Sequence, residues 1–199
     1  MIRDEDLIEQ INALWLPVYP YMADHVIAAS GLGSGKVLDF GPFAGGIAVS
    51  LLEKRPEFHA KVMDESERVL RLAVERASAK GCASRLTVEG APGDAIFEKD
   101  ASFDVVTLRG AFFFLTSTLL REVKRVLRPG GFGWIGGGYG PLTPNKVIEP
   151  IADLSRRLNE DLGKRRLDTR DCEELLAQAG ISSQAKISTE GGLWIELRA

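Results

Sequence analysis

The sequence predicts an α/β fold in which a doubly wound, mostly parallel sheet is followed by a C-terminal hairpin. Short apolar runs of strand length alternate with segments of helical periodicity between residues 36 and 138, and this alternation is typical of a parallel sheet with helices on both faces. A glycine-rich turn joins the first such run to the first such helix. Near the C-terminus, strand-like runs at 182–189 and 193–199 flank the short turn "EGG", which predicts a hairpin.

Two helical stretches are expected before the sheet. Residues 4–30 carry a helical pattern that Pro17 and Pro20 interrupt, because proline disrupts a helix interior and biases the preceding residue towards extended geometry. Strands are then expected at 36–40, 59–64, 85–90, 103–110 and 131–138, with helices at 43–54, 65–80 and 116–127. The helix at 65–80 has an apolar stripe and ends at Gly81; the stripe consists of Val69, Leu70, Ala73, Val74 and Ala77.

Two more helices are expected after the fifth strand. One follows Pro150 and covers 151–166, and its basic end "KRR" is interpreted as a solvated helix terminus. The other covers 169–180, with Thr169 as its N-cap and Gly180 as its stop. The run "AFFFL" at 111–115 is interpreted as core, with one ring facing a cofactor.

The amino-acid composition limits the classes to which the protein can belong. The chain has 199 residues, 45% of them hydrophobic, which predicts one globular domain. With 25 basic against 28 acidic side chains, nothing indicates a surface for nucleic acid. Two distant cysteines and two histidines predict neither a metal site nor a disulfide framework. The acidic N-terminus and the lack of an apolar run of roughly 18 residues predict a cytoplasmic protein without membrane segments.

The ends of the expected strands carry the candidate site, because ligands of open parallel sheets bind at the carboxyl edge. Asp39 and the "GPFAGG" turn end the first strand, Asp64 ends the second, and Arg109 ends the fourth. Asp64 lies 19 residues beyond Gly45, the spacing at which a carboxylate can accept hydrogen bonds from both hydroxyls of a ribose. The sequence therefore predicts a nucleoside-containing cofactor.

In its motifs the chain resembles the class I S-adenosylmethionine-dependent methyltransferases. The resemblance covers residues 37–199 and rests on "DFGPFAG" at 39–45, Asp64, "GDA" at 93–95, "FDVVTLRG" at 103–110, "LRPGG" at 127–131 and the hairpin. It implies a Rossmann-like sheet of seven strands, an antiparallel C-terminal hairpin strand, a helical N-terminal lid and S-adenosylmethionine as cofactor. The expected organisation is a single methyltransferase-like domain over 1–199, with a helical part at 1–35, a cofactor-binding core at 36–140 and C-terminal helices and hairpin at 141–199.

The resemblance also implies roles for individual residues. The turn from Gly41 to Gly45 would approach the methionine part of the cofactor, Asp64 would hold the ribose, and Asp94 would reach the adenine. The family pattern has a glycine where this chain has Phe43, so the benzyl group must point away or reshape the pocket. The full set of expected cofactor contacts is Asp39, Gly41, Pro42, Phe43, Gly45, Asp64, Glu65, Gly93, Asp94, Ala95, Arg109 and Gly110.

Methyl transfer from an activated sulfonium needs alignment more than a dedicated nucleophile. A general base is required only for some acceptors, and the candidates are Tyr19, Tyr21, His25 and Tyr139. The expected acceptor is a small molecule, and Arg109 hints at one with a carboxylate or another anion. Neither the acceptor nor the oligomeric state follows from the sequence.

Other interpretations stay open at this point. In these, Asp39 caps the turn through backbone amides, Asp64 caps the next helix, and Arg109 pairs with Glu89 or Asp104. At the level of function, the rivals are a noncatalytic module that binds S-adenosylmethionine and an NAD-dependent oxidoreductase. Residues 30–36, "SGLGSGK", lack the residues of a phosphate-binding loop and precede a strand, so they are interpreted as a linker.

Overall fold

The computed structural model describes residues 4–92, 95–163 and 165–199. Seven strands form one sheet in the order β3-β2-β1-β4-β5-β7-β6. Strands β1 to β5 run parallel, whereas β7 is antiparallel to both β5 and β6, so the expected C-terminal hairpin is confirmed. The strand bounds are β1 Gly35–Phe40, β2 Phe58–Asp64, β3 Leu86–Gly90, β4 Phe103–Arg109, β5 Leu127–Gly138, β6 Ala185–Ser188 and β7 Gly192–Arg198.

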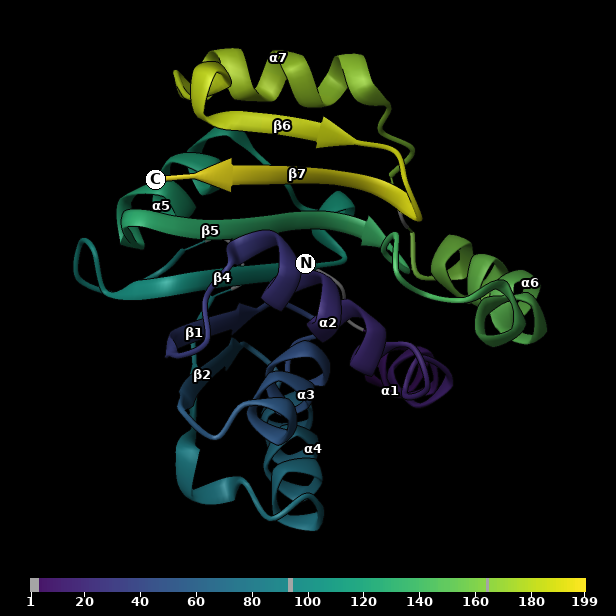
Figure 1. Ribbon diagram of the computed structural model, residues 1–199. Helices are drawn as coiled ribbons and strands as arrows, with labels where there is room; N and C mark the ends of the chain where they lie inside the picture. Colours follow the sequence, from purple (N-terminus) through teal and green to yellow (C-terminus); the bar gives the residue numbers. More distant parts are fainter. Residues whose placement is uncertain (1–3, 93–94, 164) are drawn as a thin grey trace.

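Helices cover both faces of the sheet, as the sequence predicts (Figure 1). Helices α2 (Tyr19–Ser30), α3 (Gly46–Lys54) and α4 (Glu67–Ala79) pack on one face. Helices α5 (Ser117–Val126) and α7 (Thr169–Ala179) pack on the other. The two faces have separate hydrophobic cores because each strand of the central sheet sends alternate side chains to opposite sides.

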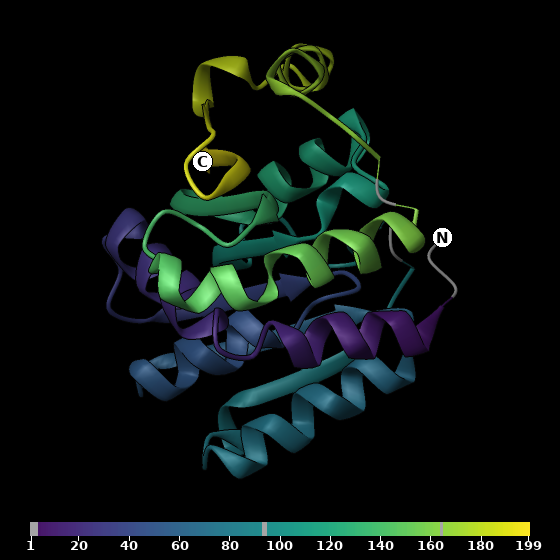
Figure 2. The ribbon, with the colours of Figure 1, turned by 90° about the vertical axis from the view of Figure 1, so that its right-hand side faces the viewer.

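Two helices lie apart from these layers. Figure 2 shows α1 (Glu5–Leu14) and α6 (Asn145–Asp161) side by side across the carboxyl ends of the parallel strands. Short 3₁₀ turns at Ala83–Arg85, Ala111–Phe113 and Ser182–Gln184 complete the chain. The edge of the sheet where ligands bind in this class of fold is therefore covered by segments from opposite ends of the sequence. Among the described helices, none combines the length and apolar character needed to cross a bilayer.

Several expected boundaries are wrong for local reasons. Helix α3 begins at Gly46 and not at 43, because Gly41 (φ +97°) and Gly45 (φ +93°) hold the preceding turn in a left-handed conformation. Helix α6 begins at Asn145 and continues through Pro150, although proline lacks the N–H that would bond the carbonyl four residues earlier. It ends at Asp161.

The remaining differences concern the edges of the C-terminal half. Strand β5 begins at Leu127 and not at 131, so "RPGG" belongs to the strand. The N-cap of α7 is Asp168, which forms a capping box with Asp171, and Thr169 is the first helical residue. In α4 the stripe is buried except for Val74, which is 40% exposed.

Candidate functional site

Asp39 fixes the glycine turn from below. Its Oδ2 accepts hydrogen bonds from the backbone N–H groups of Gly45 and Ala48, both at 2.9 Å. Its Oδ1 accepts a hydrogen bond of 2.8 Å from the Thr107 hydroxyl on β4. Burial raises the pKa of Asp39 to about 6, although these three donors oppose the shift. The capping interpretation of Asp39 is thus realised, and this carboxylate supports the turn from within the protein.

Arg109 ends β4 inside a buried network. Its guanidinium lies between two aromatic rings, 3.9 Å from the Trp15 ring centroid and 4.6 Å from that of Phe43. Nη1 donates to the Tyr19 hydroxyl at 3.0 Å, and that hydroxyl donates to Asn12 Oδ1 at 2.6 Å. The alternative pairing partners of Arg109 are engaged elsewhere, because Glu89 pairs with Lys61 and Asp104 with Arg128.

Helix α1 is joined to the glycine turn and to its neighbours by polar contacts. The Asn12 amide donates to the Pro42 carbonyl at 3.3 Å, and the Trp15 indole N–H donates to Ser155 Oγ on α6 at 2.7 Å. At the other end of α1, Glu5 contacts the Ser66 hydroxyl and Asp6 pairs with Arg68 at 2.6 Å. Helix α1 therefore bridges α4, the turn and α6, as expected of a cover over the site.

Tyr19 is an unsuitable general base in this arrangement. Burial raises the pKa of its hydroxyl, and Arg109 opposes the shift only in part. The hydroxyl accepts a hydrogen bond from Arg109 and donates its proton in a hydrogen bond to Asn12. Tyr19 therefore acts as a structural link between α1, α2 and β4.

The ring of Tyr19 also fills the space over the start of α3. A Cβ added at Gly46 would lie 2.4 Å from Tyr19 Cζ, and both residues are buried. We expect Gly46→Ala to lower the free energy of unfolding by about 1–3 kcal/mol, because the ring must move or the helix must shift. Urea unfolding measures the change. Gly33→Ala, where nothing lies within 4 Å, is the matched control, and equal effects of the two substitutions would contradict this packing.

The Phe43 side chain points from the glycine turn towards the end of β4. Its ring packs on Gly110, where an added Cβ would lie 2.4 Å from Phe43 Cδ2, and Gly110 has a left-handed φ of +78°. Phe43 is almost fully buried. Of the two possibilities that the sequence leaves for this ring, the second is the one observed: Phe43 forms a wall of the site.

Asp64 ends β2 beside this turn. Its Oδ1 accepts a hydrogen bond of 2.8 Å from the Ser66 backbone N–H, and Ser66 is the residue that caps α4. No described residue donates to Oδ2. Burial raises the pKa of Asp64 to about 6, and Glu65 and Glu5 add to the shift. Asp64 therefore keeps one carboxylate oxygen free for a ligand, as ribose binding requires.

The other expected site residues divide into three groups. Gly93 and Asp94 lie outside the described residues. Glu65 is exposed and Ala95 half-buried, on the segments that follow β2 and β3. Tyr21 is half-buried on α2.

His25 is also on α2, away from the strand ends, where it packs on Trp134 and pairs with Glu196 of β7 at 3.3 Å. Burial lowers its pKa, and Glu196 opposes the shift. Of the four candidate bases, Tyr139 alone lies on the cavity described next.

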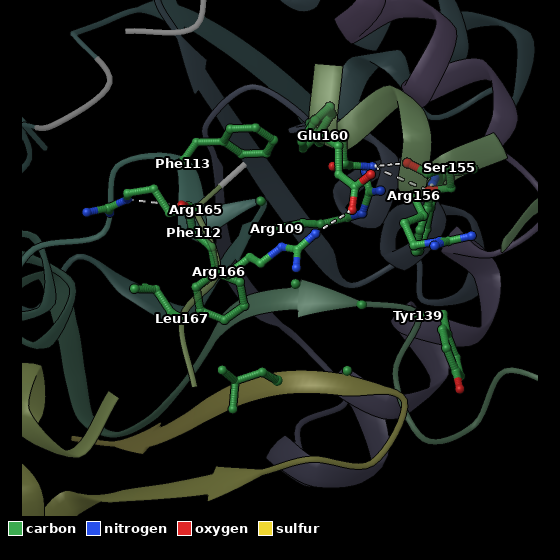
Figure 3. Close-up of a pocket in the computed structure, with 18 of the residues that line it drawn as sticks. Arg109, Phe112, Phe113, Tyr139, Ser155, Arg156, Glu160, Arg165, Arg166 and Leu167 are labelled. Atoms are coloured by element: carbon green, nitrogen blue, oxygen red, sulfur yellow. Dashed lines mark hydrogen bonds and ion pairs between the residues drawn. The ribbon is translucent and has the colours of Figure 1, made fainter. Parts of the chain in front are cut away.

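A cavity of about 630 Å³ opens beside the ends of β4 and β5, a volume typical of small-molecule sites. Phe43, Arg109 and Gly110 line it from the turn and β4, and α6 closes the opposite side (Figure 3). Tyr139 stands at its edge with the hydroxyl directed away from Arg109. The remaining polar wall is formed by Ser155, Arg156, Asn159, Glu160, Arg165 and Arg166.

Sequence reasoning missed the contributions of α1 and α6 to this cavity. Trp15 and Ser155 are separated by 140 positions, and they meet only because both helices cross the same edge of the sheet. In the basic run after α6, Arg165 and Arg166 are exposed, as expected, and Lys164 lies outside the described residues. Arg165 Nε donates to the Phe112 carbonyl at 3.1 Å and Nη2 to that of Leu115 at 2.9 Å. Phe112 and Phe113 of the "AFFFL" run line the cavity.

Comparison with known proteins supports the fold and the family. A family model described as a methyltransferase domain matches residues 37–131, from β1 to the start of β5. Two curated relatives are ubiquinone/menaquinone biosynthesis C-methyltransferases UbiE. The relative from Geobacter sulfurreducens is 35% identical over 100 residues, and that from Dinoroseobacter shibae is 36% identical over 98 residues. These matches cover 49% and 48% of this chain but 39% of each relative.

Solved structures share the architecture at low identity. A Methanococcus maripaludis protein assigned as an S-adenosyl-L-methionine-dependent methyltransferase aligns over 98% of this chain and 93% of its own, with a TM-score of 0.81 and 24% identity. An S-adenosylmethionine-dependent methyltransferase from Aquifex aeolicus aligns over 98% and 97%, with a TM-score of 0.67 and 19% identity. The chain therefore contains a segment that matches a methyltransferase domain, and its seven-stranded fold with the terminal hairpin is shared with S-adenosylmethionine-dependent methyltransferases of known structure.

Proposed function

We propose that this protein transfers a methyl group from S-adenosylmethionine to a small-molecule acceptor held in the cavity between β4, β5 and α6. One observation carries the proposal: the glycine turn and the cavity share a wall. Phe43 belongs to the turn and also lines the cavity together with Gly110. A cofactor on the turn and an acceptor in the cavity would therefore be neighbours, as a direct transfer requires.

The described residues fit the cofactor of this family. The carboxylate of Asp64 has one free oxygen at the end of β2, suited to ribose hydroxyls. The turn is held open by Asp39 and by two glycines with left-handed φ, at positions 41 and 45. When bound, S-adenosylmethionine supplies an activated methyl group, so the chain needs no nucleophile of its own.

The chain's own residues have mainly positioning roles in this proposal. Helix α1 covers the turn through the bond from Asn12 to the Pro42 carbonyl, which would exclude water from the site. Among the described lining residues, Glu160 and Tyr139 are the titratable groups besides the arginines. Glu160 pairs with Arg166 at 3.1 Å, so its carboxylate already has a partner. The arrangement is suited to an acceptor that needs little assistance with proton removal.

Calorimetric titration with S-adenosylmethionine, S-adenosylhomocysteine and NAD tests the cofactor. The protein should be checked first for cofactor carried through purification. We expect binding of the first two ligands and none of NAD. Binding of NAD alone would favour the oxidoreductase, and binding of S-adenosylmethionine without turnover on any acceptor would favour a noncatalytic module.

Asp64 should account for much of the cofactor's affinity. We expect Asp64→Ala to weaken S-adenosylhomocysteine binding by about 1–3 kcal/mol, because hydrogen bonds from the ribose to a charged group are lost. Isothermal titration calorimetry measures the change. Glu75→Gln, on the exposed face of α4, is the control and should bind normally. An unchanged affinity in folded Asp64→Ala would remove this residue from the site.

The affinity should also depend on pH through the same carboxylate. Because its pKa is raised to about 6, Asp64 becomes protonated as the pH falls from 7 to 5 and then accepts ribose hydrogen bonds less well. We expect the affinity of the wild-type protein to fall by up to about tenfold per pH unit below pH 6. In Asp64→Ala this part of the pH dependence should disappear.

A further inference from the structure

Arg109 is a buried cation without an anionic partner. Only 4% of the residue is exposed, yet no ion pair joins it to a carboxylate within the described part of the chain. Nη1 donates to the Tyr19 hydroxyl, and Nε is buried with no hydrogen-bond partner at all. Asp39, which interacts with Arg109 through space, already accepts three hydrogen bonds. An unpaired buried charge costs several kcal/mol, so the protein maintains Arg109 at a cost to stability.

The aromatic rings around Arg109 offset only part of this cost. Trp15 and Phe43 contact its two sides, and such cation–π contacts contribute about 0.5–2 kcal/mol each. Burial lowers the pKa of the guanidinium, but arginine keeps its proton in proteins. The guanidinium therefore stays charged at the cavity wall, where an anionic ligand could pair with it.

The other three arginines of the cavity are exposed, and each has a partner within the protein. Arg165 is bonded to two backbone carbonyls, Arg166 pairs with Glu160 and Arg156 with Asp153. Together with Arg109 they give the lining four cations against one carboxylate. Such an imbalance attracts anions to the cavity, and among these four arginines Arg109 is the buried one, with Nε unpartnered.

The rest of the wall is apolar and partly aromatic. Trp15, Phe43, Phe113, Ile148 and Leu193 line the same space. An apolar body would bury its surface against these side chains, and its charged end would be left for Arg109.

We infer that the methyl acceptor is an apolar, preferably aromatic, small-molecule carboxylate whose anionic group binds the Arg109 guanidinium. This inference rests on the proposed function, because it deepens the role of the same cavity. It fixes the acceptor's orientation: the carboxylate lies at the end of β4, beneath Trp15, and the apolar body extends along α6. A guanidinium fits this task because it presents several donors in one plane to the two oxygens of a carboxylate.

Calorimetric titration of the wild-type protein saturated with S-adenosylhomocysteine tests the inference, with cinnamate and its uncharged amide cinnamamide as probes. The two probes have the same shape, so the difference in affinity reports the charge. We expect cinnamate to bind at least about tenfold more tightly, as hydrogen bonds between charged groups predict. Equal binding of the two probes, or binding of neither, would overturn the inference.

The variant Arg109→Gln tests whether Arg109 is the residue that causes the preference for the charged probe. We expect this variant to lose the preference for cinnamate and to keep its affinity for S-adenosylhomocysteine within about threefold. Arg156→Gln is the matched control, since this arginine also lines the cavity but is exposed, and it should retain the preference. Loss of S-adenosylhomocysteine binding with normal cinnamate binding would instead assign Arg109 to the cofactor's carboxylate and overturn the inference.

A cavity-filling variant locates the probe if Arg109→Gln fails to fold. Ala152 lies on α6, is exposed, and lines the cavity, so Ala152→Trp should block cinnamate without affecting S-adenosylhomocysteine. Normal cinnamate binding in Ala152→Trp would place the probe elsewhere and overturn the inference. The proposed function can fail while the anion site remains. That result would be no binding of S-adenosylhomocysteine together with tighter binding of cinnamate than of cinnamamide to the ligand-free protein.

Discussion

Replacing Trp15 by alanine should lower the free energy of unfolding by about 3–5 kcal/mol, the usual range for removing a buried aromatic side chain. Trp15 is 6% exposed at the junction of three parts of the fold. Its ring lies 3.9 Å from the Arg109 guanidinium, and its indole N–H donates to Ser155 on α6. The substitution removes the apolar surface, one side of the Arg109 sandwich and the bond between α1 and α6.

Urea unfolding followed by circular dichroism measures this loss. The matched control is Leu16→Ala, because Leu16 is the next residue but is 47% exposed, and a surface change of this kind alters stability by about 0.5 kcal/mol or less. Trp15→Phe separates packing from hydrogen bonding, since it keeps a ring and removes the N–H donor. We expect it to fall between the other two variants.

The outcome also tests whether α1 covers the strand ends. If Trp15→Ala were as stable as Leu16→Ala, α1 would not be packed against Arg109 and α6, and the site would be open at this side. The expected loss would instead mean that segments from opposite ends of the chain stabilise each other across the site. The affinity of a ligand in the cavity would then depend on residues outside the matched methyltransferase segment at 37–131.

The central fold follows from local patterns, and this explains why it could be predicted. Strands such as β1 and β4 are short, largely apolar and mostly buried, and helices such as α5 present one apolar stripe. These patterns depend on neighbours in the sequence. Boundaries were less accurate, since the start of α3 depends on the left-handed φ of Gly45, which a periodic pattern does not contain.

The candidate site was predictable only where it follows from strand ends. Asp39, Asp64 and Arg109 each lie at the end of a strand. The residues at the carboxyl edge of the sheet could therefore be predicted from the sequence. The partners of Arg109 could not, because Trp15 and Tyr19 come from a helical segment whose docking depends on the whole fold. Sequence alone also could not decide how Phe43 points, since its ring position depends on the absence of a side chain at Gly110.

Replacing Asp39 by asparagine should flatten the dependence of stability on pH. The pKa of Asp39 is raised from 3.8 to about 6 in the folded protein, so between these pH values the folded state binds a proton that the unfolded state has released. Its contribution to stability is therefore fully present below pH 3.8 and is lost as the pH rises through 6. Two pKa units correspond to about 3 kcal/mol.

Asparagine at this position keeps the acceptor geometry without the charge. Its amide oxygen can accept from the Gly45 and Ala48 N–H groups, and its amide nitrogen can donate to the Thr107 hydroxyl, which replaces the bond that Thr107 now donates. We therefore expect Asp39→Asn to be at least as stable as the wild-type protein at pH 7. Asp39→Ala leaves all three donors without an acceptor and should lose about 2–5 kcal/mol.

The informative quantity is the difference in unfolding free energy between wild type and Asp39→Asn at pH 4, 5, 6 and 7. Other carboxylates, Asp64 among them, titrate in both proteins and cancel in this difference. We expect the difference to shift by up to about 3 kcal/mol in favour of the variant between pH 4 and 7. Parallel profiles would mean that Asp39 titrates alike in the folded and unfolded states. A shift of the expected sign would mean that the glycine turn is held by a buried carboxylate whose charge costs stability, and that its three hydrogen bonds, not its charge, are what the turn requires.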